Sequence, residues 1–164
     1  MSSHHVVRDN QEPALVILDS KASFGVVQEL LEWSPMIIVE SAALDTVLPW
    51  GIKIDAVIYT PSELEYVMLK TEHQQPLQFI RRDETGSGFA AALQAVASKN
   101  YPAINVVCSE PEWNTIDRFS SQHTLVVHAE GWRWSFLRQG RVDKIVPAGT
   151  EYKIRLEEET TAES

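Results

Sequence analysis

The sequence contains very little cysteine, with Cys108 as the only one among 164 residues. A single cysteine cannot form a disulfide within the chain, so a reducing compartment is expected. Cys108 ends the apolar run 104–108, and this position predicts a small buried side chain rather than a reactive thiol.

Long hydrophobic runs are also missing. No apolar run approaches the roughly 18 residues that a membrane span needs, and residues 1–11 lack the apolar core of a signal peptide. Together with the single cysteine, these absences predict a cytoplasmic protein without a membrane partner.

Basic residues are scarce, with 14 Lys and Arg against 23 Asp and Glu and a net charge of −9. An acidic chain repels nucleic-acid phosphates unless a local basic patch overrides its net charge, and only short clusters such as Arg81-Arg82 occur. Nucleic acid is therefore not an expected partner. The five histidines show no metal-ligand spacing, and there is no nucleophile triad, P-loop or dinucleotide fingerprint, so no metal site is predicted.

The sequence does contain short apolar runs that alternate with helical patterns, within a hydrophobic fraction of 44% that is ordinary for one globular domain. Strands are expected at residues 14–18, 36–39, 56–59, 77–80 and 103–108, with helices between them. This alternation predicts an α/β unit over residues 13–123: a parallel sheet flanked by helices, in a Rossmann-like three-layer arrangement.

The pattern changes after residue 123, where strand-like runs follow one another with turn residues between them. These runs are 124–128, 132–137, 142–146 and 151–156. We expect residues 124–156 to form a short antiparallel, β-rich extension of the same unit, with flexible ends at 1–12 and 157–164.

Polar residues at the carboxyl ends of the expected strands are the candidate site, because ligands of open α/β sheets bind there. Arg81 and Arg82 either bind a phosphate through their guanidinium groups or are a solvated pair. Asp83 and Thr85 are either the remnant of a metal or phosphate site or a turn and helix cap.

Two further segments begin with a helix-start signature. Thr60, Pro61 and Glu63 form the pattern of a capping box, and Ser109 is followed by a similar proline and acidic residue. Capping is the favoured role of Thr60 and Ser109, and anion binding at these helix starts is the alternative.

The side chains of Trp132, Trp134 and Phe136 alternate and therefore share one face of a strand. They either pack over the core or form a dimer interface, and we expect the dimer interface because aromatic residues are enriched at such surfaces.

Several segments are similar in order and spacing to the thiamin pyrophosphokinase family, over about residues 14–156. The best match is 51–58, Gly-Ile-Lys-Ile-Asp-Ala-Val-Ile, which resembles the family's Gly-Ile-x-Pro-Asp loop and the strand after it. Residues 41–43, 59–63 and 83–86 fall on the family's Asp-Gly-Gly, Gly-Asp-x-Asp-Ser and Asp-x-Thr-Asp elements. Residues 146–154 resemble the strand and turn that open its β-domain. The resemblance implies magnesium-dependent transfer of pyrophosphate from ATP to thiamin, and a homodimer paired through the C-terminal β region.

The departures from the family pattern fall on its acids. Magnesium is held by hard carboxylate oxygens, but Thr60 and Ser62 stand where the family has two acids, Ser41 replaces the first Asp, and Gly86 replaces a third-element acid. The chain also ends before much of the family's β-domain.

We therefore expect a catalytically impaired relative that persists as a nucleotide- or phosphate-binding protein or as a dimeric interaction module. Asp83 is the remaining catalytic candidate. The ligand-binding candidates are Ser41, Thr60, Ser62, Arg81, Arg82, Thr85 and Ser109.

Two alternatives stay open. The chain is an active thiamine diphosphokinase that uses Mg²⁺ and ATP with the displaced acids Glu40, Asp45, Glu63 and Asp83, or it is an unrelated α/β interaction protein.

Overall fold

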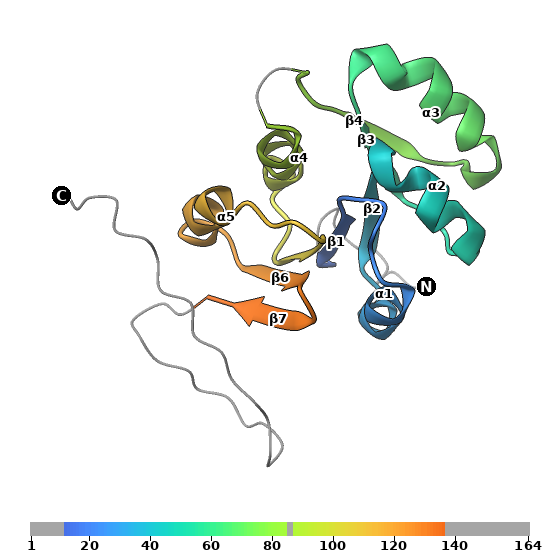
Figure 1. The fold of residues 1–164 in the computed structure, drawn as a ribbon. Coiled ribbons are helices and arrows are strands. Elements are labelled where there is room, and N and C mark those ends of the chain that lie inside the picture. Colours follow the sequence, from blue (N-terminus) through green and yellow to red (C-terminus); the bar gives the residue numbers. More distant parts are fainter. Residues whose placement is uncertain (1–11, 85–86, 137–164) are drawn as a thin grey trace, which may run out of the picture.

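Seven strands form one sheet in the order β4-β3-β2-β1-β5-β6-β7 (Figure 1). The computed structural model describes residues 12–84 and 87–136. The strands are β1 (Ala14–Ile17), β2 (Met36–Glu40), β3 (Ala56–Tyr59), β4 (Gln78–Arg81), β5 (Ile104–Val107), β6 (Leu125–Ala129) and β7 (Trp132–Ser135). The α-helices are α1 (Phe24–Leu30), α2 (Leu44–Val47), α3 (Leu64–Lys70), α4 (Gly88–Ala97) and α5 (Trp113–Ser120). Short 3-10 turns η2 (Leu31–Trp33), η3 (Ser41–Ala43), η4 (Leu48–Trp50), η5 (Pro61–Glu63) and η6 (Glu72–Gln74) extend or connect them.

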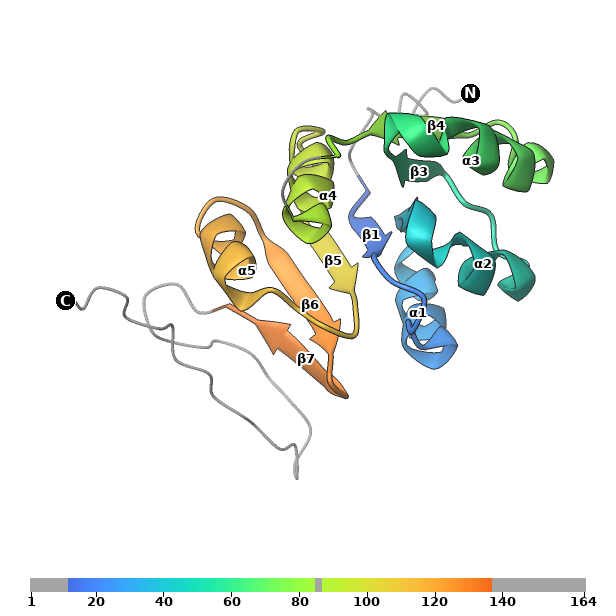
Figure 2. The ribbon, with the colours of Figure 1, turned by 45° about the horizontal axis from the view of Figure 1, so that its top comes forward.

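The central strand β1 is buried on both faces, and all four of its residues have no exposed surface. Successive side chains of a strand point to opposite faces. Ala14 and Val16 accordingly join a core cluster with buried residues of α4 and α5, whereas Leu15 and Ile17 join one with buried residues of α1, α2 and α3. Figure 2 shows these two groups of helices on either side of the strands.

The predicted mostly parallel sheet is confirmed. The strand at 56–59 has its predicted bounds, and the other described strands differ by one or two residues at an end. Such shifts are expected because hydrogen-bond pairing, which a sequence pattern does not show, defines the last residue of a strand. The helix expected between the second and third strands is a short α2 flanked by η3 and η4.

The C-terminal strands continue this sheet. β6 pairs in parallel with β5, and the antiparallel part is the hairpin of β6 with β7. Its two turn residues, Glu130 and Gly131, both have positive φ angles of 58° and 79°. A two-residue hairpin of this type requires positive φ at both positions, which a glycine adopts without strain. The predicted strands at 142–146 and 151–156 and the predicted flexible ends, apart from Glu12, lie outside the described residues.

None of the helices in the described ranges is long and apolar enough to cross a bilayer.

Burial determines the chemistry of the single cysteine. Cys108 is 5% exposed and belongs to the core cluster shared with α4 and α5, as the sequence predicts. Burial, with smaller contributions from the charges of Asp19 and Glu130, raises the pKa of its thiol to about 12.

The native thiol should therefore resist modification. We expect DTNB at pH 8 to react far more slowly with the folded protein than with the protein unfolded in urea, because only the thiolate attacks. Fast reaction of the folded protein, at the rate of the unfolded one, would show that Cys108 is accessible.

A half-buried titratable group predicts how stability depends on pH. His128 lies on β6 directly opposite Arg133 of β7. Burial and then the Arg133 charge lower the pKa of His128 to about 4 from 6.5. The unfolded chain consequently binds a proton that the folded chain does not, in the window between these two values. Above pH 6.5 this group does not reduce the free energy of unfolding. As the pH falls from 6.5 toward 4, the free energy of unfolding decreases.

Urea unfolding at several pH values tests this. We expect the free energy of unfolding to fall between pH 7 and pH 5, and His128→Gln to flatten that slope. His73→Gln, at an exposed position on η6, should keep the wild-type slope. Equal slopes for wild type and His128→Gln would contradict the assignment.

Candidate functional site

A pocket of about 290 Å³ opens at the carboxyl edge of the sheet. The chain builds β2, β3 and β4 outward on one side of β1 and then returns to place β5 on its other side. The strand order therefore reverses between β1 and β5, which is where open α/β sheets bind ligands. The residues that line the pocket are Leu18, Asp19, Glu40, Ala42, Arg82, Gly88, Phe89, Glu110 and Glu112.

On the β1–β5 side, Asp19 ties the two strand ends together. Its Oδ2 accepts hydrogen bonds from the Ser109 backbone N–H (2.7 Å) and from Ser109 Oγ (3.0 Å). The predicted cap at Ser109 is therefore wrong: α5 begins at Trp113 with Glu112 as its N-cap residue. Ser109 lies too far ahead of the helix to cap it, and the Asp19 carboxylate satisfies its polar groups instead.

On the β2–β4 side, Glu40 and Arg82 form an ion pair. Arg82 Nε lies 2.7 Å from Glu40 Oε2, and the two side chains are only 16% and 7% exposed. The guanidinium also donates from Nη1 to the Asp83 carbonyl, 3.1 Å away. It passes close to Gly88, where an added Cβ would lie 3.4 Å from Nη2. Arg82 is thus oriented by a carboxylate and by the first turn of α4.

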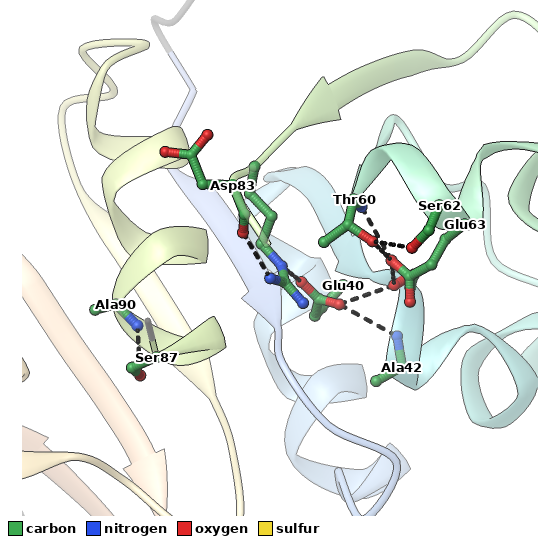
Figure 3. A network of polar contacts seen from close by, with 10 residues as sticks. Glu40, Ala42, Thr60, Ser62, Glu63, Asp83, Ser87 and Ala90 are labelled. Carbon is green, nitrogen blue, oxygen red and sulfur yellow. Dashed lines mark hydrogen bonds and ion pairs between the residues drawn. The ribbon is translucent and has the colours of Figure 1, made fainter. Parts of the chain in front are cut away.

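The amino end of α4 faces an acid supplied by the chain itself. Ser87 caps this helix by accepting from the Ala90 N–H (Figure 3). Its Oγ donates to the Glu112 carboxylate, 2.6 Å from Oε2. Helix amino ends attract anions because their N–H groups are unpaired. Glu112 therefore occupies the neighbourhood in which a bound phosphate would interact with α4.

A polar network continues from the pocket to the start of α3. Ser41 Oγ lies 2.9 Å from Glu40 Oε1 and 2.8 Å from Glu63 Oε1, and one hydroxyl proton serves only one of these carboxylates at a time. Burial by itself would raise the pKa of Glu63, but hydrogen bonds from Thr60 and Ser41 and the charge of Arg82 lower it overall. Figure 3 shows the contacts of Glu40 that run toward Ala42 and toward Glu63.

The predicted capping box at the start of η5 and α3 is confirmed. Thr60 donates to Glu63 Oε1 from its backbone N–H (2.9 Å) and from its hydroxyl (3.0 Å). Ser62 is exposed, and its backbone N–H donates to Glu84 Oε2 at 3.1 Å. Thr60 and Ser62, which the resemblance aligns with acids, are therefore part of a helix start.

The other predicted site residues do not converge on the pocket. Arg81 is exposed at the end of β4, and Asp83 is exposed with its carboxylate directed away from the Glu40 network. Of the displaced acids, Asp45 binds the Tyr66 hydroxyl (2.9 Å) and Lys70 (3.1 Å) at the surface. Thr85 and Gly86 lie outside the described residues.

The aromatic residues of the last described strand pack inward in part. Trp134 and Phe136 contact the core cluster of α4 and α5, and Trp134 meets Trp113 of α5 at 4.8 Å between ring centroids. Core packing was one of the two roles that the alternating pattern allowed for these aromatic residues, the other being a dimer interface. The homodimer through Trp132, Trp134 and Phe136 stays a prediction.

Sequence reasoning missed several pocket residues. Asp19 directly follows the first strand, so the rule that pointed to the other strand ends applies to it as well. Glu110 is not among the missed residues, because it adjoins Ser109 at the end of an expected strand and the same rule points to it. Glu112 and Phe89 had no such signal, because only the fold brings the β5–α5 loop beside the start of α4.

In the part of the chain that the structure describes, no three His, Cys, Asp or Glu side chains gather closely enough to hold a metal ion.

Comparison with known proteins returns no match to a protein family, to a curated protein or to a solved structure. The fold thus defines a mostly parallel α/β protein with a pocket at the strand ends, and the resemblance to thiamin pyrophosphokinases stays a prediction.

The Glu40–Arg82 pair should contribute strongly to stability. We expect Glu40→Gln to lower the free energy of unfolding by about 2–3 kcal/mol, because it leaves a mostly buried guanidinium without its counter-charge. Lys70→Met is the control, since it breaks the Lys70–Asp45 pair, whose side chains are 42% and 65% exposed. Its cost should be much smaller, because solvent screens an exposed ion pair. Urea unfolding measures both, and equal losses would contradict the prediction.

Proposed function

We propose that this chain is a non-catalytic, small-ligand-binding protein with a thiamin-pyrophosphokinase-like, Rossmann-like three-layer fold. The ligand would bind in the pocket at the strand ends. The absence of converging carboxylates in the described part of this edge carries the proposal. Thr60 and Ser62 stand where the resembled enzymes have acids, and Glu40 is neutralised by Arg82.

The chemistry of the resembled family explains why this arrangement favours binding over transfer. Pyrophosphoryl transfer requires a divalent cation that neutralises the charge developing on the phosphates, and such cations need hard oxygen ligands. A threonine hydroxyl is neutral and weaker, and Thr60 is already committed to Glu63. A reducing, cytoplasmic setting is part of the proposal, in keeping with the single buried cysteine.

An assay for AMP tests the catalytic half. We expect no magnesium-dependent release of AMP from ATP in the presence of thiamin above the level without protein. Release that is abolished by Asp83→Ala or Glu40→Gln would come from this chain and would establish the active alternative. Release that survives both changes would come from a contaminating kinase.

A further inference from the structure

We propose that the pocket binds a small organic cation, a ligand with a protonated amine, and not a phosphate. This inference rests on the proposed function, because it names the class of ligand for the same pocket.

The first step is the charge that lines the cavity. Four carboxylates and one guanidinium border it, which leaves a net charge of −3. The ion pair of Glu40 and Arg82 is internally neutral, so the excess comes from Asp19, Glu110 and Glu112. A phosphate entering this space would be repelled by three carboxylates, and its expected guanidinium partner is already paired.

The second step is that none of these three acids has a cationic partner among residues 12–84 and 87–136. The ion pairs Lys70–Asp45 and Arg82–Glu40 do not involve them. Asp19 and Glu112 accept hydrogen bonds from neutral backbone and hydroxyl donors. Glu110 is exposed and makes no hydrogen bond or ion pair with the described residues. A bound cation would supply the missing counter-charge.

The third step is the apolar part of the lining, which distinguishes an organic cation from a metal ion. Leu18, Ala42 and the ring of Phe89 border the same cavity. An aromatic face attracts a cationic group within about 6 Å of its centre, and apolar walls bury the carbon skeleton of a ligand. A metal ion would instead require several oxygens converging within about 2.6 Å of one point, which the described residues do not provide.

The size of the cavity limits the ligand. Its volume of about 290 Å³ is at the lower end of the range for small-molecule sites. The net charge of −9 on the whole chain also attracts cations toward the pocket.

Three ligands of nearly equal size and shape test the charge: benzylamine as the cation, benzyl alcohol as the neutral analogue and benzoate as the anion. Each is titrated into ¹⁵N-labelled full-length protein while the amide signals of Leu18, Asp19, Gly88 and Glu110 are followed by NMR. We expect saturable shifts of these amides with benzylamine, and at least fivefold weaker binding of benzyl alcohol and benzoate. That ratio corresponds to one charge interaction of about 1 kcal/mol near a solvated site.

Glu110→Gln isolates the charge without disturbing the fold, since Glu110 is exposed and has no partner in the described structure. We expect this variant to bind benzylamine about fivefold more weakly. Glu65→Gln, at an exposed position on α3 outside the pocket, makes the same change in net charge and should bind like the wild type.

The outcomes separate this inference from the function on which it rests. Tighter binding of benzoate or ATP than of benzylamine at these amides would overturn the cation inference and leave the binding function in place. No shift at these amides with benzylamine, benzyl alcohol, benzoate or ATP would overturn both. Equally weakened benzylamine binding in Glu110→Gln and Glu65→Gln would show that only the net charge of the protein matters. That result would overturn the assignment of the cation to the pocket.

Discussion

The burial of β1 between β2 and β5 is the constraint on which the rest of the structure depends. Its four residues are fully buried, so each of its backbone groups must bond to a neighbouring strand and each side chain must pack against a helix layer. Because the chain leaves β1 toward β2 and later returns to its other side at β5, the segments after these two strands diverge. The pocket occupies the space between them, and its position is a consequence of the strand order.

Polar side chains stabilise the two margins of that space in different ways. At one margin Asp19 joins the ends of β1 and β5 through Ser109, and at the other Arg82 joins β4 to β2 through Glu40. Arg82 neutralises the charge of Glu40, whereas the neutral donors of Ser109 leave the charge of Asp19 in place. Among the described residues that line the pocket, Asp19, Glu110 and Glu112 therefore have no positive partner. The net negative charge of the pocket therefore depends on which carboxylates are neutralised by ion pairs within the fold.

The same contacts explain why residues that suggest phosphate binding in the sequence have other roles in the structure. Thr60 and Ser62 belong to the start of η5, and Arg82 is held against Glu40 and Gly88. An arginine at a strand end offers a fork of donors only while those donors are unpaired. Whether such an arginine has a protein partner depends on a residue from another strand, here 42 positions away along the chain. The residue type and location of Arg82 suggested that it binds a phosphate. Its ion pair with Glu40 gives it a partner within the protein instead.

The elements of the fold could be read from the sequence because their causes are local. The alternation of apolar runs predicts strands such as 56–59, and the Thr60–Glu63 spacing predicts a helix start, since both depend on neighbours within a few residues. The site could be read only in part. Asp19 and Ser109 meet across 90 residues, and Glu112 reaches Ser87 only because α4 and α5 pack on the same face. Sequence alone determined where the strands of the sheet and the helix start at Thr60 form, although it misplaced the cap at Ser109. The tertiary structure decided which charges are neutralised, because ion pairs and hydrogen bonds depend on distances in space rather than on spacing along the chain.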